Sequence, residues 1–239
     1  GRFIMKNPKQ LQKNLKSNKR HSNPLRIFTY ANNPNTAFKK AIEEIVFNFG
    51  EETKITVLGR NKFDINEIVN DKNNMQSEFK VITKGYQKNI IYEKYSKLKM
   101  EYLTVHRSKG IEGDNVIIIN LENDLYGFPN RLSDDPILSP LLTESDDFQY
   151  DEERRLFYVA LTRTKNSVYL MAPVYNESVF CDELVMDFNM KYEPSDQDSI
   201  IARKANCPRC QKGFLVVRKT LEMEMNFWDV ITTHYVIIH

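Results

Sequence analysis

The sequence predicts an α/β fold in which a largely parallel β-sheet is covered by helices on both faces. Short runs rich in β-branched and aromatic residues alternate along the chain with stretches whose apolar residues recur at helical spacing. This alternation is typical of parallel strands joined by helical crossovers. The 239 residues suit one domain of ordinary size with appendages. Ligands of such folds meet the carboxyl-terminal edge of the sheet, and we expect the site there.

The first predicted strand covers residues 26–30, where apolar and β-branched residues cluster. A turn rich in Asn and Pro at residues 32–35 leads into a helix over residues 36–49. Its buried face is expected to carry Ala37, Ala41, Ile42, Ile45 and Phe49. The same patterns predict strands at residues 54–58, 79–83, 102–105, 116–120 and 167–171, and helices at residues 65–69, 151–165 and 177–189. Residues 122–150, rich in Asp, Pro and Ser, predict an irregular surface segment.

The predicted helix at residues 151–165 has a core-facing stripe that ends in a cation. One face carries Leu156, Val159, Ala160 and then Arg163. Asp151 is expected to cap the first turn. An arginine at the end of an apolar stripe requires an anionic partner, and the spacing leaves two open: a carboxylate of the same fold or the phosphate of a ligand.

Three segments together resemble a known family. Residues 152–164, Glu-Glu-Arg-Arg-Leu-Phe-Tyr-Val-Ala-Leu-Thr-Arg-Thr, closely resemble the sixth motif of superfamily-one helicases of the UvrD/Rep group. Residues 102–120, which include Thr-Val-His-Arg-Ser-Lys-Gly-Ile-Glu-Gly, resemble the fifth motif, and Ile-Thr-Val-Leu-Gly-Arg at residues 55–60 is similar to the fourth. The resemblance implies the second RecA-like lobe of a DNA helicase. The short interval between Arg60 and Thr104 favours the compact lineage that includes bacterial helicase IV.

The resemblance also implies roles for individual residues. Arg60 and Arg163 would be two arginine fingers that stabilise the charge developing on the transferred phosphoryl group of ATP, which is bound with Mg²⁺. Glu112 would hydrogen-bond the ribose, and Gly110 would allow a close backbone approach because glycine tolerates positive φ. The single-stranded DNA would be contacted by Thr104, His106 and Lys109. For His106, a satisfied histidine at a strand end is the alternative.

One motif of such ATPases is absent from the sequence. No Gly-x-x-x-x-Gly-Lys followed by Ser or Thr occurs in these 239 residues. We therefore expect ATP and Mg²⁺ to be bound mainly by a first RecA-like lobe, with residues 1–24 as the linker from it. The fragment alone is expected to be inactive as a helicase. A second function class stays open: an ATP-gated factor that remodels RNA polymerase or another protein, as some relatives in the compact lineage do.

Composition excludes several classes of protein. Hydrophobic residues make up 41% and charged residues 28%, without an apolar run long enough to span a membrane and without a signal peptide. A formal net charge of +2 is too small to argue for a nucleic-acid partner. The 3 cysteines cannot form a disulfide framework, which favours the reducing cytoplasm.

The expected domain boundaries place the RecA-like lobe at residues 25–195 and an incomplete zinc-ribbon-like tail at residues 196–239. Cys207 and Cys210 have the spacing that grips one zinc ion. A ribbon needs a second pair, and no cysteine follows Cys210. His234 and His239 could complete a site by spacing, but the intervening segment resembles no zinc-finger core. Zinc is therefore expected only if the tail were complete.

Our hypothesis for the incomplete tail is a shift of reading frame. Residues 227–239 can be encoded by a string that, moved by one base at a thymine run, specifies Phe-Leu-Gly-Cys-Asn-Asn-Tyr-Pro-Leu-Cys-Asn-Tyr-Thr. This alternative contains the second Cys-x-x-Cys. Resequencing the gene is expected to reveal the altered thymine run, whereas an intact run in a clean reading frame would remove the hypothesis.

Overall fold

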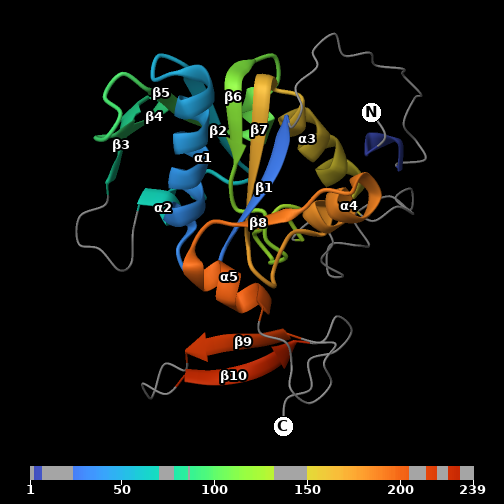
Figure 1. Ribbon diagram of the computed structural model, residues 1–239. Coiled ribbons are helices and arrows are strands. Elements are labelled where there is room, and N and C mark those ends of the chain that lie inside the picture. Colours follow the sequence, from blue (N-terminus) through green and yellow to red (C-terminus); the bar gives the residue numbers. More distant parts are fainter. Residues whose placement is uncertain are drawn as a thin grey trace.

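The computed structural model describes residues 3–6, 24–69, 78–85, 87–131, 150–204, 214–219 and 226–231. They form an eight-stranded sheet in the order β3-β4-β5-β2-β6-β7-β1-β8 (Figure 1). The strands are β1 (Leu25–Tyr30), β2 (Lys54–Gly59), β3 (Phe79–Lys84), β4 (Gln87–Tyr92), β5 (Lys99–Thr104), β6 (Gly113–Ile118), β7 (Thr164–Pro173) and β8 (Tyr192–Pro194). The helices are α1 (Pro34–Phe49), α2 (Ile65–Val69), α3 (Asp151–Leu161), α4 (Val179–Phe188) and α5 (Gln197–Lys204), with short 3₁₀ turns η1 (Ile4–Lys6) and η2 (Val105–Ser108).

The α/β prediction is confirmed, but the sheet is mixed. The strands from β5 to β8 in the sheet order pair in parallel, whereas β3 and β4 add an antiparallel extension next to β5. The turn between β3 and β4 uses Gly85 at φ 59°, a conformation that favours glycine. Sequence reasoning missed β4, in which only Ile90 and Tyr92 are buried, because its exposed and half-buried polar residues obscure the apolar pattern.

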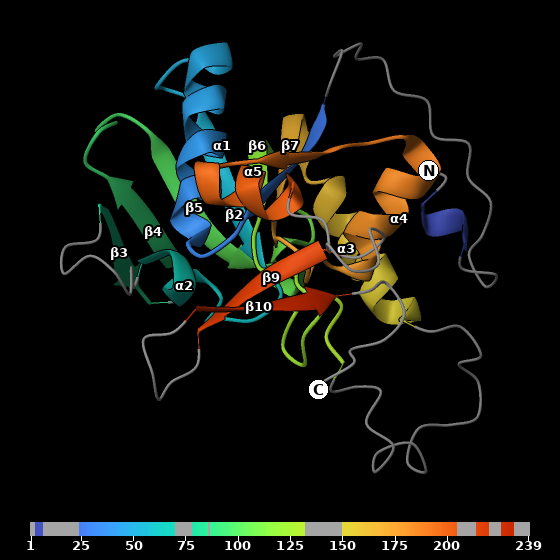
Figure 2. The ribbon, with the colours of Figure 1, turned by 60° about the horizontal axis from the view of Figure 1, so that its bottom comes forward.

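Helices cover both faces of the sheet, as predicted. Neighbouring residues of a strand point to opposite faces, so Phe28 packs in one core and Ile27 in the other. The first core contains the buried stripe of α1, including Ala41 and Ile45, together with α2. The second core contains α3 and α4. Figures 1 and 2 show α1 on one side of the parallel strands and α3 with α4 on the other.

The amino-terminal ends of α1 and α3 are capped differently. Asn33 caps α1, because its side-chain oxygen accepts the backbone N–H of Asn35 at 2.9 Å. Asp151 was expected to cap α3, and this expectation is wrong. Tyr150 occupies the cap position at φ 64°, and the Asp151 carboxylate is buried without a hydrogen-bond partner among the described residues.

The chain after β7 adds elements that the sequence did not predict. β8 pairs with β1, and Thr36 donates to Asp196 at 2.8 Å just before α5. An antiparallel hairpin follows, formed by β9 (Phe214–Lys219) and β10 (Asn226–Ile231). The expected zinc ligands Cys207 and Cys210 lie outside the described residues. Among the described residues, no helix is long and apolar enough to cross a membrane.

The second core predicts a large effect for one aromatic residue. Phe157 is fully buried and stacks on Phe180 at 5.1 Å, with further ring contacts to Phe3 and Phe128. Phe157→Ala should lower the free energy of unfolding by about 3–5 kcal/mol, since it removes a ring and leaves a cavity. Urea denaturation measures the change. Phe47→Ala is the matched control, because Phe47 is 88% exposed, and a comparable loss there would contradict the assignment of the core.

Candidate nucleotide and nucleic-acid sites

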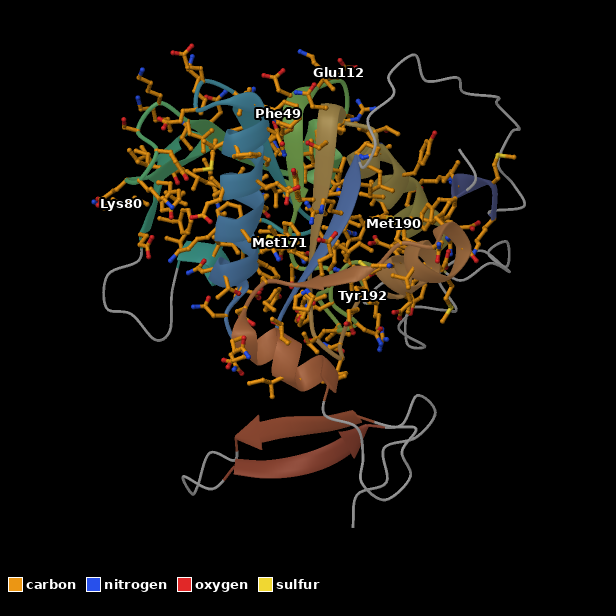
Figure 3. The ribbon with its side chains drawn as sticks, viewed as in Figure 1. Phe49, Lys80, Glu112, Met171, Met190 and Tyr192 are labelled. Carbon is orange, nitrogen blue, oxygen red and sulfur yellow. The ribbon has the colours of Figure 1, made fainter. Side chains whose placement is uncertain are left out.

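The structure divides the expected site residues between opposite edges of the sheet. Arg60 follows β2 and Thr104 ends β5, so both lie at the carboxyl-terminal edge. Glu112 precedes β6 and Arg163 precedes β7, so both lie at the amino-terminal edge. Figure 3 shows Glu112 at the top of the sheet, at the end opposite to α5. The expectation that the whole site lies at the carboxyl-terminal edge is therefore not met.

Arg163 lies directly beyond the end of α3. Its Nε donates to the carbonyl oxygen of Val159 at 3.1 Å, and its own carbonyl accepts the N–H of Gly113 at 2.8 Å. Within the described part of the chain, no carboxylate forms an ion pair with Arg163. Arg26, Arg60 and Arg154, by contrast, are each paired with a glutamate. The terminal N–H groups of Arg163 are thus not committed to a carboxylate in this part of the fold.

The backbone hydrogen bond between Gly113 and Arg163 places the chain segment of Glu112 next to that of Arg163 along the edge. Gly113 cannot carry a side chain without moving its neighbours, because a Cβ there would lie 2.6 Å from the Thr56 hydroxyl. Glu112 itself is exposed. Gly110 adopts φ 84°, as the sequence predicted for the turn before Glu112. An anionic cofactor could approach the backbone here, with Arg163 as the available cation.

Arg60 is held by a carboxylate that sequence reasoning did not single out. Its Nε lies 2.9 and 3.0 Å from the two Glu153 oxygens, and its terminal nitrogen lies 2.7 Å from Oε1. Glu153 also accepts the N–H of Asn130 at 3.0 Å, and its side chain is 6% exposed. In the sequence, Glu153 could be recognised only as an acidic residue in the first turn of a helix, where many acidic residues lie in solvent.

The two expected arginine fingers do not converge. Arg60 binds Glu153 in the first turn of α3, whereas Arg163 bonds to Val159 near its end. These two helix positions are separated by six residues, which correspond to about 9 Å of helical rise. In this conformation the two guanidinium groups therefore do not face one common phosphate.

The charges of Arg60 and of its partner Glu153 both act on the pKa of His106. Partial desolvation and the nearby Arg60 cation lower the pKa of His106 below its usual value of 6.5, and Lys109 acts in the same direction. Glu153 opposes these effects, because a carboxylate favours the charged imidazole. The ring is exposed. A mainly neutral imidazole at pH 7 can accept or donate a hydrogen bond at this surface without adding a full charge.

Thr104 lies at a pocket whose charged lining residues, within the described part of the chain, are all cationic. This cationic pocket has a volume of about 150 Å³ and is lined by Lys62, Thr83, Gly85, Lys88, Tyr102, Leu103, Thr104 and Arg107. The Lys88 ammonium donates to the carbonyl of Lys62 at 2.7 Å and lies 5.6 Å from the centre of the Tyr102 ring. Hydroxyl groups and ammonium groups together suit a phosphate. The pocket was not predicted, because its residues come from separate strands.

Carboxylates near the same edge are buried or close to one another. Asp64 is fully buried, and this burial raises its pKa although Asn61 donates to it. Burial raises the pKa of Glu122 to about 7, and Glu67 and Asp124 add to this effect. Glu122 is therefore only partly ionised near neutral pH. No group of side chains suited to a metal ion occurs among the described residues.

Comparison with known proteins finds relatives for part of the chain. Residues 86–174 match the family model of the UvrD-like helicase C-terminal domain. Over 91 residues the chain is 38% identical to DNA helicase IV of Escherichia coli K12. This aligned stretch covers 38% of the chain and 13% of that protein. Over 72 residues it is 39% identical to a "Probable DNA helicase II homolog" of Mycoplasma capricolum subsp. capricolum. This aligned stretch covers 30% of the chain and 8% of that protein.

A solved structure is also similar. The C-terminal domain of a possible DNA helicase from Lactobacillus plantarum WCFS1 aligns with a TM-score of 0.43 and 13% identity, over 73% of this chain and 86% of that chain. The sequence matches cover only a small part of the two helicases. They show that residues 86–174 are similar to the UvrD-like helicase C-terminal domain.

The burial of Glu153 predicts an asymmetric response to loss of its partner. Arg60→Ala leaves a buried carboxylate unpaired and should lower the free energy of unfolding by about 2–4 kcal/mol at pH 7. Glu153→Ala should cost less, because the Arg60 side chain is 19% exposed and can turn towards water. Adding Glu153→Ala to Arg60→Ala should then restore stability in urea denaturation. Simple addition of the two losses would contradict the coupling.

Proposed function

We propose that this chain is the second motor lobe of an ATP-dependent DNA helicase or translocase, and that Arg163 is its arginine finger. The observation that supports this most is the guanidinium of Arg163, which has no carboxylate ion pair within the described residues, while the Arg163 backbone is bonded to Gly113, the residue after Glu112. The match to UvrD-like helicases covers both residues. A cation left uncommitted at such a position fits an anionic ligand better than an internal ion pair.

The chemistry requires a cation that stays charged while phosphoryl transfer proceeds. Negative charge spreads over the oxygens of the transferred group, and a guanidinium stabilises it without losing a proton. Mg²⁺ bound with ATP would neutralise phosphate charge. Glu112 would accept a hydrogen bond from a ribose hydroxyl, and the Gly110 turn would leave room for the nucleotide. The phosphate-binding loop has no counterpart in these 239 residues, so we place it in a first RecA-like lobe that closes on this edge.

We restrict the finger role to Arg163. Arg60 forms its bonds with the buried Glu153, and reaching a phosphate would require breaking them. Arg60 instead contributes to the opposite edge, where Thr104, His106 and Lys109 would contact single-stranded DNA. Helix α3 joins the two edges: its first turn holds Arg60 and its end carries Arg163. Closure on ATP at one edge could thus be transmitted to DNA at the other through one rigid helix.

The test is the ATPase activity of the full-length protein that contains this lobe, measured with and without single-stranded DNA. Arg163→Ala should lower the DNA-stimulated turnover number by about a hundredfold or more while ATP still binds, because the lost contact acts mainly in the transition state. Arg155→Ala is the matched control on the same helix. Arg155 is exposed, and among the described residues its ion pair is a 3.4 Å contact with Glu152.

Two outcomes would contradict the proposal. Unchanged turnover in Arg163→Ala would remove the finger role. If the ATPase activity of the wild type does not respond to DNA, the proposed role as a DNA motor is wrong. The alternative is then favoured, a factor that remodels RNA polymerase or another protein. A normal response in Arg155→Ala is needed in both cases, since it separates the chemistry of Arg163 from general disturbance of α3.

A further inference from the structure

Two exposed aromatic rings lie together at the carboxyl-terminal edge of the sheet. Phe63 follows β2, and Tyr126 lies in the loop after β6. Their ring centroids are 5.9 Å apart at an interplanar angle of 81°. Their exposed fractions are 48% and 47%, and that of the neighbouring Leu125 is 45%. A group of large apolar side chains in contact at the surface indicates a binding site more strongly than a single one does.

The backbone beneath this pair is fixed by side-chain hydrogen bonds. The Asn61 amide donates to the carbonyl of Tyr126 at 2.7 Å and to Asp64 at 3.2 Å. The buried Asp64 also accepts the N–H of Asn61 at 2.8 Å, and the Tyr102 hydroxyl donates to the Asn61 carbonyl. The loops that carry the two rings are therefore tied together before any ligand binds. Such preorganisation reduces the entropy lost on binding.

Charge beside the pair selects the kind of ligand. Lys62, the residue before Phe63, lines the cationic pocket together with Lys88, Arg107 and the hydroxyl-bearing Thr104. Among the described residues, no acidic side chain lines this pocket. Asp124, in the loop of Tyr126, makes the other side less favourable for an anion. A ligand with both an aromatic face and a phosphate would thus place its phosphate over Lys62 and its aromatic face against the rings.

We infer that Phe63 and Tyr126 form a base-stacking platform for single-stranded DNA, whose phosphates bind in the cationic pocket. This inference rests on the proposed function and adds contacts to the bases. A single strand fits better than a duplex, since a base offers its face to an aromatic side chain only when it is unstacked from its neighbours. Stacking accepts every base, which suits a protein that moves along DNA of any sequence.

The test compares two DNA strands in binding to the full-length protein by fluorescence anisotropy. One is a thymidine oligonucleotide, and the other has the same length but abasic sites in place of the bases. Phe63→Ala and Tyr126→Ala should each weaken binding of the thymidine strand about tenfold and leave binding of the abasic strand nearly unchanged. Lys62→Ala should weaken binding of both strands and reduce the slope of log affinity against log salt by about 0.7.

Phe47→Ala is the matched control, because it removes an exposed phenyl ring from α1, outside both loops. It should bind both strands like the wild type. If the wild type binds DNA but the ring variants bind the thymidine strand normally, the platform is wrong and the proposed motor function stands. An equal loss on both strands would also overturn the platform. If the wild type binds neither strand, the proposed function fails and the platform fails with it.

Discussion

The ion pair between Arg60 and Glu153 connects parts of the chain that sequence places far apart. Glu153 is buried in the first turn of α3, and it accepts bonds from Arg60 after β2 and from the backbone of Asn130 after β6. A carboxylate removed from water is stable only when such partners satisfy it. The pair therefore fixes where α3 begins relative to the sheet. The direction of α3 then determines where Arg163 lies.

The end of α3 is fixed by a second contact. The backbone bond between Gly113 and Arg163 joins the last turn of α3 to the start of β6. With both ends attached, the helix links the carboxyl-terminal edge, where Thr104 and the cationic pocket lie, to the edge of Glu112. This arrangement suits the proposed motor, in which nucleotide and DNA bind at separate edges. In this proposal α3 spans both edges of the sheet as one rigid element, so a displacement at one edge would be transmitted to the other.

Opposite charges at the carboxyl-terminal edge have different consequences. Lys62, Lys88 and Arg107 line the cationic pocket. Among the carboxylates, Asp64 is buried and Glu122 is partly protonated near neutral pH, whereas Asp124 is exposed on the side of Tyr126. The overall charge of +2 gave no indication of this separation. Local placement, more than net charge, makes the edge suitable for a polyanion.

The sequence by itself determined the α/β class, the buried stripe of α1 and the positive φ of Gly110, because these follow from local periodicity and from the conformational freedom of glycine. The resemblance to helicases was confirmed for residues 86–174. Only the tertiary structure decided that Glu153 binds Arg60, that Arg60 and Arg163 do not converge, and that Phe63 meets Tyr126. Each of these depends on which strand ends become neighbours and on how α3 crosses them. Contacts between residues far apart in the chain are set by sheet order and helix direction, which local patterns do not encode.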